Sequence, residues 1–288
     1  MNKIKLKAPA KINLSLSIKG LREDGFHELE MIMQSISLYD YITLEKIEKG
    51  IEISCDDIRI PTDSNNLAYQ AAELIIKNYN LDKGVKISIE KNIPLAAGLA
   101  GGSTDAAAVL KAMSKLFSLN LNKKELYKLA KEIGSDVSFC IYGGTALATS
   151  RGEKITQLAN IEKNHLVLVT PTVEVSTAAI YKAYDKKEIN LKIPTEKLVK
   201  DINKNKNIDC SLPFANELEK VTEKRIEEVN LIKDKLREFS PELVLMSGSG
   251  PSVFAIVKNE KEADRILNNW SRENDFIYKC HTIKKQIN

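Results

Sequence analysis

Alternation of apolar and polar residues predicts that the first third of the chain is rich in β-strands. Apolar side chains recur at every second position in the stretches 12–18, 42–44 and 85–89. A period of two is typical of strands with one buried face. Helical spacing of apolar residues follows at 66–78, 105–117 and 123–133, and the third of these segments is followed by Gly134. Strands combined with such helices predict an α+β fold.

The second half of the chain continues with strands and helices. We expect strands at 166–169, 243–246 and 253–257 and a helix at 222–238. The stretch 186–207 is rich in Lys and Asn and has few large apolar residues, which predicts a solvated connection or a weakly held helix rather than core. A boundary near Ala159 divides the chain into two expected domains, residues 1–159 and 160–288.

Composition is that of an ordinary globular protein, with 288 residues, 43% of them hydrophobic and 28% charged. The net charge of +4 is too small to indicate a nucleic-acid partner, and it suits an anionic small substrate equally well. Apolar runs are far shorter than the roughly 18 residues of a membrane span, and no signal-peptide core follows Met1, so we expect a cytoplasmic protein. The four cysteines include no CxxC pair, which argues against a compact zinc site.

A glycine-rich loop between a predicted strand and a predicted helix is the most informative segment. Its residues are Pro94, Leu95, Ala96, Ala97, Gly98, Leu99, Ala100, Gly101, Gly102, Ser103 and Thr104. Glycine lets a backbone approach a ligand closely, and the following helix offers unpaired N–H groups with a partial positive charge. We therefore favour a phosphate site. The alternative is a turn that Ser103 or Thr104 caps.

This loop differs from the commonest nucleotide motifs. No Lys follows Gly102, which excludes a Walker A loop, and the glycine spacing does not fit GxGxxG. A second glycine pattern at 246–254 links two predicted strands. It either closes over phosphates or forms a tight connection.

Three further segments carry candidate chemistry. Lys11 and Asn13 lie on the strand face opposite to the apolar residues, where the alternative is a pair of solvent-facing side chains on an edge strand. Phe26 and His27 follow Gly25, so that an aromatic ring and an imidazole could stack on a base and hydrogen-bond its edge, or simply pack. Asp136 follows Gly134, and a sharp glycine turn there would aim a carboxylate into a cleft unless Asp136 is a helix cap.

In this order the segments resemble the three motifs of the GHMP kinase superfamily, the group of galactokinase, homoserine kinase, mevalonate kinase and phosphomevalonate kinase. Within that superfamily, five stretches are similar to a kinase of the non-mevalonate isoprenoid route whose substrate carries a cytidine diphosphate. These stretches are 9–14, 22–27, 134–137, 150–153 and 216–219. The resemblance spans the chain.

The resemblance implies a fold, a reaction and a set of site residues. The fold is a two-domain α+β GHMP kinase, with an N-terminal domain like the second domain of ribosomal protein S5 and a ferredoxin-like C-terminal domain. The reaction is transfer of the terminal phosphate of ATP, with Mg²⁺, to a substrate hydroxyl. The implied residues are Lys11 and Asp136 for catalysis, Pro94 to Thr104 with Asn66 and Lys91 for ATP, and Asn13, Phe26 and His27 for the substrate. The ligands of Mg²⁺ stay open, with Ser103 and Thr104 as candidates.

Two positions depart from the family pattern. Ala100 stands where glycine is frequent, and its methyl group narrows the loop slightly. Phe26 stands where tyrosine is frequent, and it keeps the stacking face without the hydroxyl.

Two other functions remain open from the sequence. One is a GHMP kinase for homoserine, a sugar or mevalonate, against which the turn at 25–27 argues. The other is a non-catalytic, RNA-associated binding module, since S5-like domains also occur in ribosomal proteins. Lys11, Asp136 and the mild charge argue against that module. We expect a small-molecule substrate, no nucleic-acid or membrane partner, and a monomer or weak homodimer.

Overall fold

The computed structural model describes residues 1–185 and 191–285, and the chain divides into two compact units. Unit 1 comprises Met1–Ala10, Leu38–Ile93 and Ala100–Tyr142, and unit 2 comprises Lys11–Ser37, Pro94–Leu99 and Gly143–Asn288. Both units are discontinuous in sequence because the long strands β1 (Lys3–Leu21) and β2 (His27–Ile47) contribute to each of them. The division into 1–159 and 160–288 stays a prediction.

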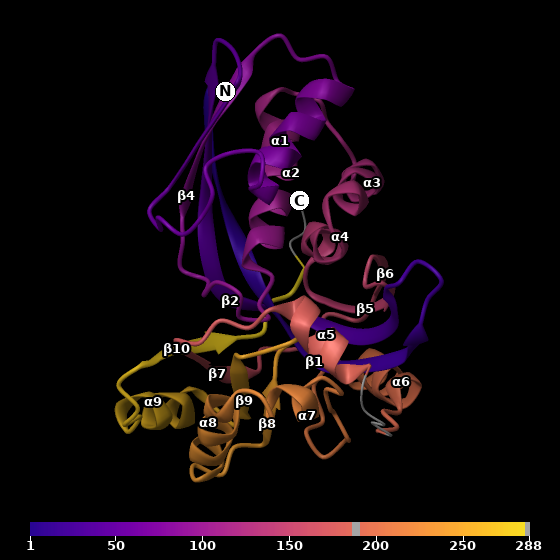
Figure 1. Cartoon of the computed structure of the whole chain (residues 1–288), viewed down its shortest axis with the longest axis vertical. Coiled ribbons are helices and arrows are strands. Elements are labelled where there is room, and N and C mark those ends of the chain that lie inside the picture. Colours follow the sequence, from indigo (N-terminus) through magenta and orange to yellow (C-terminus); the bar gives the residue numbers. More distant parts are fainter. Residues whose placement is uncertain (186–190, 286–288) are drawn as a thin grey trace. The chain divides into compact units, whose positions relative to one another are not determined.

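Unit 1 combines strands with four helices (Figure 1). Strand β4 (Gly84–Glu90) pairs in parallel with β3 (Ile51–Cys55) and antiparallel with the end of β2. The helices are α1 (Leu67–Asn78), α2 (Gly101–Leu116), α3 (Lys123–Ile133) and α4 (Ser135–Tyr142). Helix α2 packs against both α1 and α4 through an alanine-rich, fully buried surface. The helices predicted at 66–78 and 123–133 are confirmed, and the helix predicted at 105–117 begins earlier, at Gly101, inside the glycine-rich loop.

Side-chain caps explain where two of these helices begin. Asn66 accepts a hydrogen bond from the Ala68 N–H at 2.8 Å at the start of α1. Asn122 and Glu125 form a reciprocal capping box at the start of α3. Such caps satisfy N–H groups that have no partner inside the helix.

Unit 2 contains the N-terminal half of β2 and an antiparallel sheet that belongs to this unit alone. Strand β5 (Thr145–Ser150) pairs with β2 and with β6 (Lys154–Gln157). The separate sheet consists of β7 (His165–Pro171), β8 (Leu243–Met246), β9 (Val253–Val257) and β10 (Asp275–His281). Their order, β10-β7-β9-β8, is that of a ferredoxin-like split βαβ arrangement. The predicted strands 166–169, 243–246 and 253–257 lie in it.

The helices of unit 2 are α5 (Thr177–Tyr184), α6 (Thr195–Asn205), α7 (Glu219–Thr222), α8 (Glu227–Arg237) and α9 (Glu260–Asn268). Figure 1 shows α8 and α9 packed beside this sheet, where α9 contacts β7 and β10 and α8 contacts β8. The predicted helix at 222–238 therefore begins later than expected, because Thr222 ends the short helix α7.

Of the two alternatives predicted for 186–207, the second part of the segment forms the helix, but the expectation that it contributes nothing to the core is wrong. Helix α6 occupies 195–205, and Leu198 and Ile202 are completely buried. These two apolar residues lie one helical turn apart, which is sufficient to bury one helix face although the composition is polar. Residues 186–190 lie outside the described residues.

Residues 8–17 of β1 are buried on both faces of the strand, except that Pro9 is less completely covered. Among the described residues, no helix combines the length and the apolar character needed to cross a membrane.

Candidate active site

Lys11 and Asn13 lie inside unit 2 as neighbours on one face of β1. Lys11 is only 5% exposed, and its Nζ donates to Asn13 Oδ1 at 2.8 Å. The Asn13 amide in turn lies 3.4 Å from the Met31 sulfur. The alternative of solvent-facing side chains is therefore wrong. A buried lysine that is hydrogen-bonded to a buried amide is held in a defined position, which suits a functional cation.

The turn at Gly98 meets the second glycine turn, 247–252, within unit 2. Gly98 has a φ of +74°, and a Cβ at this position would lie 2.1 Å from the Ser247 carbonyl oxygen. The Ser247 hydroxyl also donates to the Gly98 carbonyl at 3.0 Å. Only glycine combines this backbone conformation with so close a contact. The two glycine patterns of the sequence are thus packed together.

Lys11 lies at the contact between the Gly98 turn and the turn 247–252. A Cβ at Gly248, which has a φ of +58°, would lie 3.1 Å from the Gly98 carbonyl oxygen and 3.4 Å from Lys11 Nζ. The Lys11 N–H donates to the Leu99 carbonyl at 3.1 Å. Unit 2 therefore brings one buried ammonium group and two glycine turns to one point. Gly248 is buried and Gly98 is partly buried, so the positive charge of Lys11 would act on an anion that binds next to these turns.

Asn216 holds the second glycine turn in shape. Its amide donates to the Met246 carbonyl at 2.9 Å and to the Gly248 carbonyl at 2.8 Å. Thr222 adds a hydrogen bond of 3.1 Å to the Ser249 carbonyl. The sequence marked 216–219 as a stretch of resemblance but assigned no role to Asn216.

The remainder of the first glycine loop lies in unit 1 as the start of α2. Ala100 takes a left-handed conformation, with φ 57° and ψ 34°, and α2 begins at Gly101. No described side chain caps this end of the helix, so the alternative of a cap by Ser103 or Thr104 is wrong. The N–H groups of the first turn keep their capacity to bind an anion.

Lys91 lies in a buried ion cluster of unit 1. Its ammonium contacts Asp40 and lies 2.8 Å from Asp105 Oδ2. Asp40 also accepts from the N–H groups of Asn92 and Ile93, whereas Asp105 Oδ1 is buried without a hydrogen-bond partner. Burial raises the pKa of Asp105 to about 7, and the Asp40 charge adds to the rise while Lys91 opposes it.

The predicted ATP contacts of Lys91 and Asn66 therefore coexist with structural roles. Lys91 is engaged with two carboxylates, and the Asn66 side chain both caps α1 and donates to the Pro61 carbonyl at 2.8 Å. Their contact with a nucleotide stays a prediction. Asp105, in the second turn of α2, is a buried polar residue that the sequence reasoning missed.

Asp136 lies in the first turn of α4, where the helix dipole favours a carboxylate. Gly134 alone links α3 to α4, and its φ of 175° is an extended conformation open to any residue, so this link does not depend on glycine. At the other end of α4, the Lys111 ammonium donates to the Cys140 carbonyl at 2.8 Å. Burial lowers the pKa of Lys111 to about 8. Since Asp136 belongs to unit 1 and Lys11 to unit 2, their joint action stays a prediction.

Phe26 and His27 have different surroundings in unit 2. Phe26 is 54% exposed, with the Arg151 guanidinium 5.0 Å from the centre of its ring. The His27 ring stacks on Tyr181 with centroids 4.8 Å apart, and its Nε2 lies 2.6 Å from Asp185 Oδ1. An exposed aromatic ring beside a fixed imidazole suits a flat heterocycle. Tyr181 was missed because nothing in its local sequence links it to His27.

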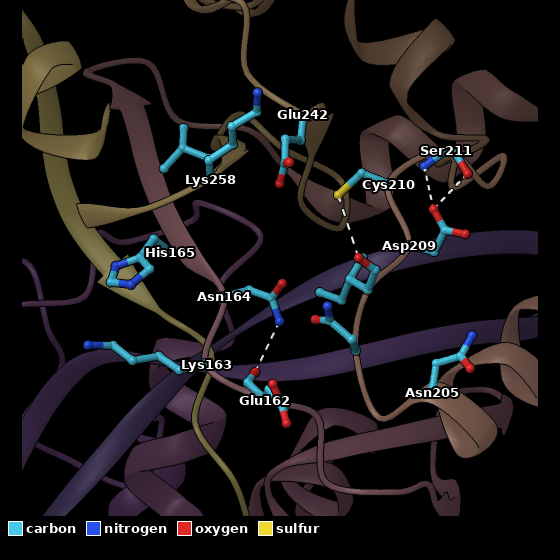
Figure 2. Close-up of a pocket in the computed structure, with 13 residues that line it drawn as sticks. Glu162, Lys163, Asn164, His165, Asn205, Asp209, Cys210, Ser211, Glu242 and Lys258 are labelled. Atoms are coloured by element: carbon cyan, nitrogen blue, oxygen red, sulfur yellow. Dashed lines mark hydrogen bonds between the residues drawn. The ribbon is translucent and has the colours of Figure 1, made fainter. Parts of the chain in front are cut away.

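A cavity of about 890 Å³ lies elsewhere in unit 2 (Figure 2). It is lined by residues of 162–165 and 205–211 together with Glu242, Val257 and Lys258. Glu242 precedes β8 and Lys258 follows β9, so the cavity is at the strand ends opposite to the turn 247–252. Burial and then the Glu242 charge raise the pKa of Cys210 to about 11, which leaves an unreactive thiol there. None of the predicted site residues lines this cavity.

Two protein-family models match the chain. They describe the GHMP kinases N terminal domain, over residues 66–144, and the GHMP kinases C terminal, over residues 196–275. A solved crystal structure of 4-(cytidine 5'-diphospho)-2C-methyl-D-erythritol kinase is 31% identical, with a TM-score of 0.81 over 97% of this chain and 100% of that one. Homoserine kinase from Cytophaga hutchinsonii, at 21% identity and a TM-score of 0.75, shares the fold. The predicted two-domain GHMP kinase fold is thus confirmed.

Curated relatives are more similar still. The 4-diphosphocytidyl-2-C-methyl-D-erythritol kinase of Acetivibrio thermocellus is 49% identical over 264 residues, 91% of this chain and 93% of that protein. The protein of the same name from Bacillus pumilus is 44% identical over 281 residues, 97% of each chain. The second of these matches covers nearly the whole chain.

Proposed function

The chain belongs to the GHMP kinases, and we propose that it transfers the terminal phosphate of ATP to a hydroxyl of 4-diphosphocytidyl-2-C-methyl-D-erythritol, giving the 2-phosphate. The observation that carries this proposal is the identity of 44–50% to curated kinases of that name over at least 87% of the chain. It is an ATP-dependent small-molecule kinase of the non-mevalonate route to isoprenoid precursors.

The two glycine segments would bind the phosphates of ATP. The uncapped start of α2 offers N–H groups in unit 1, and Lys11 beside Gly248 offers a cation in unit 2. Phosphoryl transfer needs positioning and charge stabilisation more than covalent catalysis, and backbone N–H groups supply both without reorganisation.

Mg²⁺ is expected to accompany ATP and to offset its phosphate charge. Among the described residues no group of three or more His, Cys, Asp or Glu side chains could hold a metal ion. This fits Mg²⁺, which keeps most of its waters and phosphate ligands and needs only one or two protein oxygens. Ser103 and Thr104 are the candidate oxygens in the first turn of α2.

Asp136 and Lys11 would act on the attacking hydroxyl. The Asp136 carboxylate accepts the hydroxyl proton while the substrate oxygen bonds to the γ-phosphorus and the bond to the bridging oxygen of ADP breaks. The ammonium group of Lys11 would stabilise the developing negative charge on the oxygen. Hydrogen bonding to Asn13 holds Lys11 in one orientation for this task.

The cytosine would bind between Phe26 and His27. Phe26 presents an exposed ring for stacking, and His27 is held by Tyr181 and Asp185 so that its remaining ring nitrogen can read the base edge. Asn13 would contact the substrate near the reacting hydroxyl. We further propose a monomer or weak homodimer in the cytoplasm, without a nucleic-acid partner.

An acceptor panel tests the function. ADP formation would be measured with ATP, Mg²⁺ and one of three acceptors, 4-diphosphocytidyl-2-C-methyl-D-erythritol, homoserine or mevalonate, with phosphorus NMR of the product. We expect turnover with the cytidine compound alone and a new monoester phosphorus signal. Phosphorylation of homoserine or mevalonate instead would reassign the substrate, and no turnover with any acceptor would favour a binding module.

A further inference from the structure

Glu217 is a buried carboxylate that the reaction proposed above does not use. It is 3% exposed, and its neighbour Asn216 forms a parallel bridge with Leu16 of β1. Two backbone hydrogen bonds of 3.0 Å, from Leu16 to Ala215 and from Glu217 to Leu16, fix this segment on the strand. The position of Glu217 is therefore set by the same strand that carries Lys11.

Two hydroxyl groups donate to the Glu217 carboxylate. The Ser17 hydroxyl donates to Oε1 at 2.9 Å, and the Tyr184 phenol donates to Oε2 at 2.6 Å. Short hydrogen bonds to an ionised acceptor are stronger than neutral ones. Burial and the Glu217 charge both raise the pKa of Tyr184, so the phenol keeps the proton that it donates.

Tyr184 is the last residue of α5, and the end of this helix contacts the His27 ring. Tyr181, one turn earlier, stacks on His27, and the Tyr184 ring lies edge-on to it with centroids 6.3 Å apart. Asp185 follows as the C-cap residue and contacts His27 Nε2. An interaction that holds Tyr184 in place therefore also constrains the orientation of the His27 ring.

The N-terminal end of α5 is hydrogen-bonded to the second glycine turn. The Thr177 hydroxyl lies 2.9 Å from the Ser249 hydroxyl, in a hydrogen bond whose donor can be either group. Glu217 and Asn216, adjacent in the chain, hold the last turn of α5 and the Gly248 carbonyl respectively. Helix α5 is thus held at both ends by elements that also support the phosphate side of the site.

We propose that Glu217 is a positioning residue for the cytidine-bearing substrate, because its hydrogen bond to Tyr184 fixes the last turn of α5 against His27. The proposal rests on the proposed function of Phe26 and His27 as the base-binding pair. It assigns Glu217 no contact with substrate, ATP or the reacting atoms.

Tyr184→Phe is the sharpest variant because it removes one hydroxyl and keeps the ring. We expect the KM for 4-diphosphocytidyl-2-C-methyl-D-erythritol to rise about tenfold, the scale of one lost hydrogen bond to a charged acceptor. The KM for ATP and kcat should stay within about twofold. Glu217→Ala should have the same effect, and Glu217→Gln, which keeps an acceptor oxygen, should restore most of the affinity. Ser17→Ala is the matched control, because it removes the other donor of Glu217 without touching α5.

A second readout does not depend on turnover. The chain has three histidines, so the ring proton signals of His27, His165 and His281 can be assigned by single substitutions. We expect Tyr184→Phe to shift the His27 signals and to leave the other two unchanged. Unchanged His27 signals, an unchanged KM for the cytidine compound, or equal rises in both KM values would overturn the proposal. If the wild-type protein does not phosphorylate the cytidine compound, the proposed function fails, and the His27 signals still decide whether Glu217 orients that ring.

Discussion

Lys91 and Asp105 form a buried ion pair, with 2.8 Å between Nζ and Oδ2, beside the first turn of α2. A Cβ at Gly101 would lie 2.9 Å from the Lys91 ammonium nitrogen, so the glycine leaves room for this cation. Asp40 shares the same ammonium and is better satisfied, because two backbone N–H groups also donate to it. Asp105 Oδ1, in contrast, is buried without a hydrogen-bond partner.

Asp105→Asn should change how stability depends on pH. The folded-state pKa of about 7 is higher than the ordinary value of 3.8, so the folded protein binds this proton more tightly than the unfolded chain. Asp105 therefore makes the free energy of unfolding fall as the pH rises from about 4 to about 7. The variant should lose this contribution. Melting temperatures of both proteins between pH 5 and pH 8 measure it, with the exposed Asp82→Asn as control; parallel curves for wild type and Asp105→Asn would contradict the assignment.

Asp136→Asn and Lys11→Met should each lower kcat by roughly 10²-fold to 10⁴-fold, the scale of a positioned acid, base or cation. Their stabilities should differ. Lys11→Met leaves the buried Asn13 Oδ1 without its donor, which costs about 1–3 kcal/mol of unfolding free energy. Asp136→Asn keeps its size and its place in α4, so its melting temperature should change little. Steady-state kinetics and thermal melts check both, and full activity of either variant would remove that residue from the mechanism.

Gly102→Ala should weaken ATP binding by at least about tenfold and leave the fold intact. The nearest atom to a Cβ at Gly102 is 3.9 Å away, on Leu67, so the methyl group fits the protein and would obstruct only a phosphate. Calorimetric titrations with a non-hydrolysable ATP analogue and with the cytidine substrate measure the two affinities separately.

Gly98→Ala is the comparison variant for Gly102→Ala, because here the added methyl group does not fit the protein. Its Cβ would lie 2.1 Å from a backbone oxygen, and we expect a large loss of melting temperature. Unchanged ATP affinity in a folded Gly102→Ala protein would require a nucleotide site away from α2.

Phe26→Ala should raise the KM for the cytidine substrate by roughly tenfold to a hundredfold, because stacking of a base on an aromatic ring contributes about 1–3 kcal/mol. The KM for ATP should stay the same. Phe276→Ala is a matched control, since Phe276 is 52% exposed and lies in β10. An unchanged KM for the cytidine substrate in Phe26→Ala would mean that the Phe26 ring only packs against Arg151.

Regular spacing of apolar residues predicted many of the helices and strands. Contacts between distant parts of the chain explain the features that were not predicted. Strands β8 and β9 and helix α3 have the predicted bounds because each is a short apolar or amphipathic run with clear ends. The burial of Lys11 was not predictable from alternation, which assumes one solvated face, whereas this part of β1 is covered on both. Tyr181 meets His27 across 154 residues of sequence, and the residues between them carry no signal of that contact.

The candidate site was likewise predicted in part. The glycine segments were identified from their glycine content, which the sequence displays directly, and Gly98, Gly248 and Gly250 do take positive φ values. Asp105 and Glu217 were not, because a charged residue inside a helix or loop is usually solvated, and only packing against Lys91 or Tyr184 gives it a role.

The contact between Gly98 and the turn 247–252 consists of backbone atoms and the Ser247 hydroxyl, and none of these groups titrates between pH 5 and pH 9. The shape of this part of the site is therefore constant across the range in which kinases are assayed. A bell-shaped dependence of turnover on pH would consequently report the protonation of titratable groups of the protein and the substrates, and not a rearrangement of the glycine turns.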